Sequence, residues 1–165
     1  MSAKKKRGVT LIELIISMAI FAILMVTVTV AFTSNSNILS KVDMKSELQL
    51  DAQMIQEALS TVALECSGVE SSTLNRLVLK DSLALNQLHL FELNRNSLVY
   101  KVIEVHDNKE DILSEKLLSK YVNSMSIEVH ANEKSMKYKI ELSMTSGKNT
   151  ERLMMENQIV FRNSN

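Results

Sequence analysis

Few side chains in this sequence combine the types and spacing that catalysis or metal binding requires. The three histidines, His89, His106 and His130, are far apart, and two of them fall on expected strand faces with outward-facing neighbours. The segment Asp107–Asp111 groups oxygen ligands, but it lacks the alternation and the glycine of a calcium-binding loop. The sequence contains no glycine-rich phosphate loop, nucleophile elbow or acid/base pair, so we predict no catalytic residue, no metal site and no cofactor.

One carboxylate, that of Glu13, has an unusual setting. It is the single charge in an apolar run from Val9 to Phe32 that contains neither proline nor glycine. A helix of this length, at ~1.5 Å rise per residue, covers a hydrocarbon core of ~30 Å. A carboxylate inside an apolar span costs roughly 2.5–3.5 kcal/mol on insertion scales, so we expect Glu13 to have a partner.

A basic cluster precedes this run and predicts its orientation. The four cations directly before Gly8 are Lys4, Lys5, Lys6 and Arg7. Such a cluster stays on the cytoplasmic side of a membrane, which places everything after Phe32 on the outer face of the cytoplasmic membrane. An uncleaved signal anchor is the alternative. A secretory signal is disfavoured, because Ala31-Phe32-Thr33-Ser34 is a poor match to its cleavage site and the apolar run is too long.

The segment from Arg7 to Leu14, Arg-Gly-Val-Thr-Leu-Ile-Glu-Leu, resembles the leader junction of type IV pilins and of type II secretion pseudopilins. In that family a membrane aspartyl peptidase cuts after the glycine, the new N-terminus is methylated, and a glutamate is the fifth residue after the cut. The resemblance implies cleavage between Gly8 and Val9, N-methylation of Val9, and pairing of Glu13 with an N-terminus during assembly. Val9 departs from the phenylalanine or methionine that is usual at its position.

Composition excludes some other functions. Lys plus Arg and Asp plus Glu both number 19, and removal of the four cations in residues 1–8 leaves 15 basic against 19 acidic side chains. A mildly acidic body is poorly suited to non-specific nucleic-acid binding. The chain has a single cysteine, Cys66, so no internal disulfide forms, and we expect Cys66 to be a small buried apolar residue.

An apolar stripe at three- and four-residue steps predicts that the helix continues beyond the polar segment Thr33–Asn37. The stripe consists of Ile38, Val42, Leu48, Ala52, Ile55, Leu59, Val62 and Cys66. Gly68 then offers a helix stop. We therefore predict one helix from about Val9 to Ser67, with a break at Thr33–Asn37 as the alternative.

After Gly68 the apolar period changes to two residues, which predicts half-buried strands. The clearest are Met125–Val129 and Met136–Met144, joined as a hairpin, and a last strand at about Met154–Arg162. Three less regular strands are predicted at Arg76–Lys80, Gln87–Leu93 and Leu98–Val105, with turns at Asn94–Asn96 and Thr145–Thr150. Asp107–Tyr121 is predicted as a loop followed by a short helix. The predicted fold class is α+β, with a long N-terminal helix packed on an antiparallel sheet of about five to six strands.

The predicted organisation is a leader at 1–8, a membrane-spanning and filament-core helix at 9–32, its amphipathic continuation at 33–67, and an extracytoplasmic β-rich domain at 68–165. This body resembles the minor pseudopilins of the J type and the W-type minor pilins. Those proteins share a long helix, two small sheets and a chain end of the form strand-Arg-Asn, here Ile159-Val160-Phe161-Arg162-Asn163. The F-type pseudopilin of competence systems is a neighbouring possibility.

These resemblances imply a non-enzymatic filament subunit with a pilin-like fold. It would be a minor pilin or pseudopilin of a type IV pilus, a type II secretion pseudopilus or a competence filament, located in the tip or initiation complex. The implied partners are other pilin or pseudopilin subunits, the prepilin peptidase and the assembly platform of the cytoplasmic membrane. The precursor would cross that membrane once, with its N-terminus in the cytoplasm. A single-pass membrane-anchored extracytoplasmic binding module is the alternative, and an anchored envelope enzyme is a weaker one.

Overall fold

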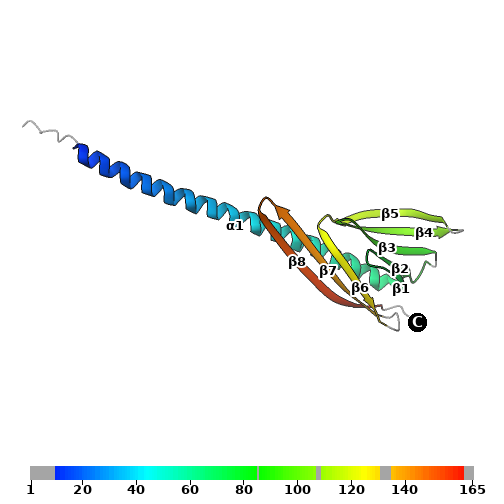
Figure 1. Ribbon diagram of the computed structural model, residues 1–165. Coiled ribbons are helices and arrows are strands. Elements are labelled where there is room, and N and C mark those ends of the chain that lie inside the picture. The colour runs from blue at the N-terminus through cyan, green and yellow to red at the C-terminus, as the bar shows by residue number, and fades with distance from the viewer. Residues whose placement is uncertain (1–9, 85, 107–108, 131–134, 162–165) are drawn as a thin grey trace, which may run out of the picture. The chain divides into compact units, whose positions relative to one another are not determined.

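The computed structural model describes residues 10–84, 86–106, 109–130 and 135–161, and within them one helix is followed by eight strands (Figure 1). The chain forms two compact units that divide between Ser40 and Lys41. Helix α1, Leu11–Glu65, begins in the first unit and supplies one layer of the second.

In the first unit α1 is exposed on all sides. Every residue from Leu11 to Phe32 is exposed, in keeping with a run that has no polar face. The threonines in this run satisfy their own hydroxyl groups by donating to backbone carbonyls one turn earlier. Thr27 Oγ1 lies 2.8 Å from the carbonyl oxygen of Leu24, and Thr29 Oγ1 lies 2.8 Å from that of Met25. Such back-bonding lets a polar side chain remain in an apolar helix.

The alternative of a helix break at Thr33–Asn37 is wrong, because all five residues are helical. The segment is polar but contains neither proline nor glycine, and these are the residues that most strongly interrupt a helix.

In the second unit α1 buries one stripe. The buried residues are Met44, Leu48, Ala52, Ile55, Leu59, Val62 and Ala63. The prediction that Ile38 and Val42 belong to this stripe is wrong, because each is 56% exposed. Met44 lies four residues before Leu48 and therefore on the same face, whereas Val42 lies six residues before it and points elsewhere.

The helix ends at Glu65, and the predicted stop at Gly68 is wrong. The backbone N–H and the hydroxyl of Ser82 both donate to the Glu65 carbonyl oxygen, at 3.0 and 2.5 Å. They satisfy one of the carbonyls that a helix end leaves without an internal partner. Cys66, fully buried as predicted, opens strand β1, and Gly68 lies in that strand beside an irregularity in its pairing.

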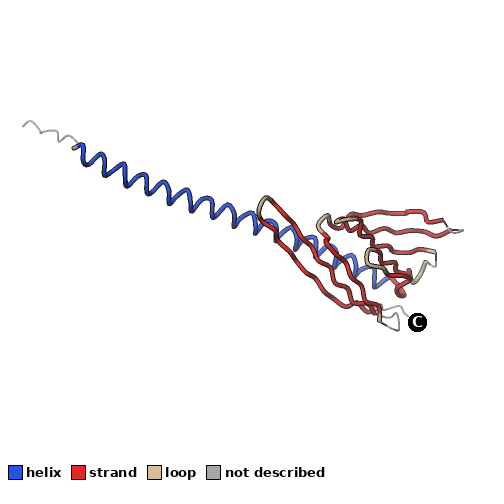
Figure 2. The backbone as a smooth tube through the Cα atoms, viewed as in Figure 1, coloured by secondary structure: helices blue, strands red, loops and turns tan. Residues whose placement is uncertain are grey.

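The strands form two antiparallel sheets (Figure 2). The five-stranded sheet has the order β1 (Cys66–Ser72), β2 (Arg76–Asp81), β3 (Gln87–Asn94), β4 (Ser97–His106) and β5 (Lys109–Ser119). The three-stranded sheet has the order β6 (Val122–Val129), β7 (Ser135–Ser146) and β8 (Asn149–Val160). The two sheets therefore contain more strands than the predicted single sheet of five to six. β1 was not predicted because it has no regular alternation, and the segment of β5 was predicted as a loop and a short helix.

The prediction of a loop and short helix at Asp107–Tyr121 is wrong, because β5 occupies this segment and pairs with β4. Its apolar residues have spacings of one and four, which also fit a helix. Two irregularities in the pairing with β4 explain why a strand carries this pattern, since each shifts the alternation by one residue. Asp107 and Asn108 lie outside the described residues.

The predicted turns and the β6–β7 hairpin are confirmed. Arg95 joins β3 to β4 with φ of 56°, and Gly147 joins β7 to β8 with φ of 59°. Glycine adopts such a left-handed conformation without steric cost, which explains its use at the second turn.

One core joins the buried face of α1 to both sheets. The alternation predicted for β7 is confirmed, since Met136, Tyr138, Ile140 and Leu142 are buried. The predicted α+β class, a long N-terminal helix packed on antiparallel sheets, is therefore confirmed.

Two leucines on α1 allow a matched test of this packing. Leu48 is 1% exposed and Leu50 is 58% exposed. We predict that Leu48→Ala lowers the free energy of unfolding by about 2–5 kcal/mol, because it leaves a cavity in the core. Leu50→Ala should change it by no more than ~0.5 kcal/mol. Urea unfolding of the detergent-solubilised chain measures both, and equal losses would contradict the assigned helix face.

Candidate functional site

Of the predicted assembly residues, Glu13 lies in the part of the chain that the structure describes. The cleavage and methylation residues Gly8 and Val9 lie outside the described residues. The orientation cluster Lys4, Lys5, Lys6 and Arg7 lies outside them too.

Thr10 and Glu13 together cap the start of α1. The Glu13 Oε2 atom accepts from the backbone N–H of Thr10 at 2.8 Å and from its hydroxyl at 2.9 Å. The Thr10 Oγ1 atom accepts in turn from the backbone N–H of Glu13 at 3.4 Å. This reciprocal arrangement is a capping box, which satisfies two backbone donors that a helix start leaves without partners.

The capping box involves one of the two carboxylate oxygens of Glu13. Both contacts from Thr10 are to Oε2, and no described residue donates to Oε1. Glu13 is exposed, like its apolar neighbours. The carboxylate can therefore hold its own helix start and still accept a hydrogen bond from outside the subunit.

The apolar surface around Glu13 suits a membrane. Among the described residues, α1 is the helix that is long and apolar enough to cross a bilayer, judged by length and composition. Its most apolar stretch is not buried within the protein, unlike the core helix of a globular domain.

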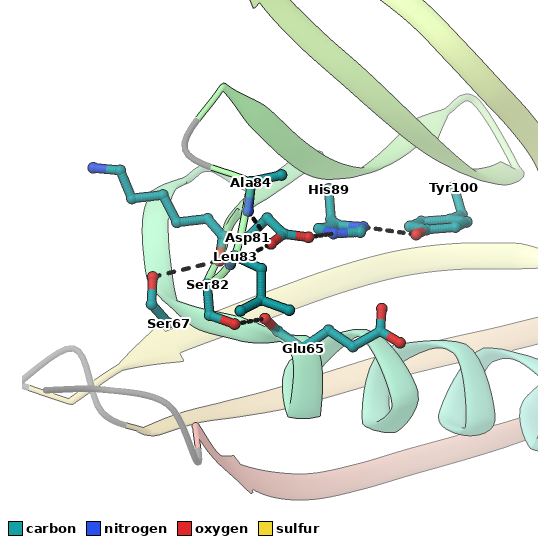
Figure 3. A network of polar contacts seen from close by, with 9 residues as sticks. Glu65, Ser67, Asp81, Ser82, Leu83, Ala84, His89 and Tyr100 are labelled. Carbon is teal, nitrogen blue, oxygen red and sulfur yellow. Dashed lines mark hydrogen bonds and ion pairs between the residues drawn. The ribbon is translucent and has the colours of Figure 1, made fainter.

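A second polar cluster extends across three adjacent strands of the five-stranded sheet (Figure 3). His89 on β3 lies between two partners: its Nδ1 is 2.7 Å from the Tyr100 hydroxyl and its Nε2 is 3.1 Å from Asp81 Oδ2. The other oxygen of Asp81 accepts from the backbone N–H groups of Leu83 and Ala84, at 2.7 and 2.9 Å. The cluster therefore links β2, β3 and β4. It also holds the turn that contains Ser82, the residue that caps the C-terminus of α1.

For His89, the prediction of a strand face with outward-facing neighbours is wrong. Its exposure is 5%, and its ring plane is nearly parallel to that of Tyr100, at 4°, with 6.0 Å between the ring centroids. In the neutral imidazole, a proton on Nε2 is donated to Asp81 and Nδ1 accepts from the Tyr100 hydroxyl. His89 lies two and four residues before the buried Phe91 and Leu93, so the three side chains share one face of the strand. This spacing is a sequence signal that could have revealed the burial of His89.

The electrostatics of the cluster do not favour nucleophilic chemistry. Burial, with smaller effects from nearby negative charges, raises the pKa of the Tyr100 phenol to about 12 and that of the Cys66 thiol to about 12. Burial also acts to raise the pKa of Asp81, but the hydrogen bonds from Ala84, Leu83 and His89 outweigh it and lower the pKa. A thiol and a phenol that stay protonated are poor nucleophiles, so we interpret the cluster as structural.

The remaining metal candidates are dispersed. Among the described residues no group of three or more histidine, cysteine or acidic side chains is placed to hold a metal ion. His106 contacts Glu104 at 3.3 Å on an exposed part of β4, and Lys109–Asp111 begin the exposed part of β5.

The comparisons with known proteins support the N-terminal site. Residues 3–29 match the model of the prokaryotic N-terminal methylation motif. No curated protein and no solved structure matches the chain. The match contains the basic cluster, Gly8, Val9, the capping box and most of the apolar run.

The buried cluster generates a pH-dependent prediction. Asp81→Asn should lower the free energy of unfolding by about 1–2 kcal/mol at pH 7, because hydrogen bonds to a charged acceptor are replaced by neutral ones. The folded pKa of Asp81 is lowered, so its contribution is fully present above the unfolded value near 4 and is lost as the pH falls through the folded value. The difference between variant and wild type should therefore shrink below about pH 4.

Urea unfolding at pH 7, 5 and 3 measures this difference. Glu70→Gln is the matched control, because Glu70 is an exposed carboxylate paired with Lys80 at the surface. Its effect should stay within ~0.5 kcal/mol at every pH. A deficit for Asp81→Asn that is equal at pH 7 and pH 3 would contradict the ionised, hydrogen-bonded state of Asp81.

Proposed function

We propose that this chain is a minor subunit of a pilin-type filament, either a type IV pilus, a type II secretion pseudopilus or a competence filament. The observation that carries the proposal is the match to the N-terminal methylation motif at the head of an exposed apolar helix. The same helix continues into an α+β unit and buries its other end there. The role is structural and not enzymatic.

The proposed mechanism is assembly after processing. The prepilin peptidase cuts between Gly8 and Val9, and Val9 is methylated. The basic cluster is thereby removed, and with it the charge that holds the chain in its membrane orientation. The apolar part of α1 then leaves the bilayer and packs among the corresponding helices of neighbouring subunits, which replace lipid around its exposed side chains.

Within that bundle Glu13 provides register. The new α-amino group of Val9 is a cation in an apolar environment, and so is that of each neighbour. Removing one partner of a buried ion pair costs on the order of 3–5 kcal/mol, so an incoming subunit is most stable where its charge meets an opposite one. The Oε1 atom of Glu13, to which no described residue donates a hydrogen bond, is available to accept from the neighbour's ammonium group while Oε2 caps the helix.

The capping box makes the test of Glu13 sharper. Glutamine also serves in a capping box, so Glu13→Gln keeps the helix start and removes the charge. We predict that Glu13→Gln and Glu13→Ala both insert in the membrane and are cleaved, but incorporate poorly into filaments. Immunoblots of membranes and of sheared filaments measure the two steps separately.

Thr10→Ala is the matched control for this test. It removes the capping hydroxyl, at a cost of about 1 kcal/mol, and it keeps the carboxylate. It should assemble far better than Glu13→Gln. Normal incorporation of the Gln variant in a complementation assay would refute the charge-pairing role.

A second prediction concerns processing. Replacing Gly8 with a bulky residue should block cleavage, because the family's peptidase accepts a very small side chain at this subsite. The variant should accumulate in the membrane at the mass of the uncleaved chain, as seen by intact-mass measurement. Efficient cleavage of Gly8→Phe would contradict a prepilin-type leader, and failure of the wild-type chain to be cleaved would favour a membrane-anchored binding module.

A third prediction concerns abundance. A tip or initiation role is supported by the resemblance to J-type pseudopilins and W-type minor pilins, with which the chain shares a long helix and two small sheets. We expect this chain in sheared filaments at well under a tenth of the amount of the major subunit. Quantitative mass spectrometry gives the ratio, and equimolar amounts would rule out a minor role.

A further inference from the structure

The five-stranded sheet buries apolar side chains on both of its faces. The core shared with α1 takes one face, with Leu77 from β2 and Phe91 from β3. Val78, Leu90 and Ile103 are 4%, 5% and 1% exposed, yet they do not belong to that core. Val78 and Leu90 directly adjoin the core residues of their own strands in sequence, so they lie on the opposite, outer face of the sheet.

Strand register joins these three residues into one apolar patch on the outer face. Val78 is paired with Leu90. Ile103 is paired with Leu88 on one side and with Ile112 on the other. Paired residues of adjacent strands share a face. Because a sheet face that is open to water leaves its side chains exposed, the burial of this patch requires a cover.

An ion pair crosses the outer face and supplies that cover. Arg76 of β2 donates from Nη2 to both carboxylate oxygens of Glu110 of β5, at 3.4 and 3.5 Å. Arg76 lies two residues before Val78, and Glu110 is paired with Val105, two residues after Ile103, so both lie on the outer face. Strands β3 and β4 separate β2 from β5, and a flat sheet would hold these two strands ~14 Å apart. The sheet therefore curls and brings β5 toward β2 across the patch.

Strand β5 has few other attachments. All residues of Lys109–Leu117 are exposed, whereas the last two residues of the strand are buried and Leu118 belongs to the core on α1. β5 is an edge strand, and its pairing with β4 contains two irregularities, which bend a strand. Among the described residues, Arg76–Glu110 is the one ion pair that β5 makes.

The Arg76–Glu110 pair holds β5 only weakly. The two side chains are 41% and 55% exposed, and water and salt screen an ion pair in that setting. The Nε atom of Arg76 is buried and has no hydrogen-bond partner among the described residues, which reduces the stability that closure provides. A strand anchored in the core at Leu118 and otherwise held by one screened ion pair can open locally.

We propose that Lys109–Leu117 is a strap, which closes the outer apolar patch through the Arg76–Glu110 pair and opens about its anchor at Leu118. Opening uncovers Val78, Leu90 and Ile103. The core on α1 stays closed during this motion, because no residue of the strap belongs to it. The strap is a property of the α+β unit and does not depend on the proposed role in a filament.

Thiol labelling of the detergent-solubilised, full-length chain measures the opening of the two cores separately. Ile103→Cys introduces a thiol into the outer patch, and the native Cys66, which is fully buried, reports on the core on α1. Glu110→Arg places two cations together, so N-ethylmaleimide should label the introduced thiol at least fivefold faster, while the rate at Cys66 stays within twofold. Adding Arg76→Glu restores the pair in reverse and should return labelling at position 103 to within twofold of its original rate.

Glu70→Lys is the matched control, because it reverses one member of the exposed Glu70–Lys80 pair at the other edge of the same sheet. Labelling at position 103 should stay within twofold in this variant. Hydrogen exchange of the chain without the introduced thiol is a second measurement, and Glu110→Arg should accelerate it at least fivefold in β5 and less than twofold in β7. No acceleration at position 103 and in β5, or an equal acceleration at both thiols, would overturn the inference.

Discussion

The structure depends on a change of environment along a single helix. Over its first part α1 is apolar and exposed on all sides, which is stable only against lipid or other helices. From Met44 onward one face is buried against two sheets while the opposite side stays polar and acidic. A helix without proline or glycine provides this change without a break.

The features that followed from the sequence are those in which the local pattern and the tertiary environment agree. The alternation in β7 has one face on the core and one in solvent, so period and burial coincide. β5 is different, because it is an edge strand with pairing irregularities, and the spacing of its apolar residues resembles that of a helix. This segment forms a strand because it pairs with β4, and a local sequence pattern contains no information about that pairing.

The candidate sites divide in the same way. Glu13 could be selected from the sequence because a charge in an apolar run is costly wherever it lies. The Thr10–Glu13 capping box also has a recognisable sequence pattern, a threonine followed three residues later by a glutamate before an apolar run. The cluster around His89 was not, because its partners Asp81 and Tyr100 come from adjacent strands and meet only through strand register.

We propose that this chain is processed and then built into a filament through its apolar helix. Intact-mass analysis of the chain recovered from sheared, purified filaments tests this proposal. We expect a form that begins at Val9, lacks residues 1–8 and carries one N-methyl group. Filament material that begins at Met1 or Ser2, or a chain that stays in the membrane and never enters filaments, would contradict it.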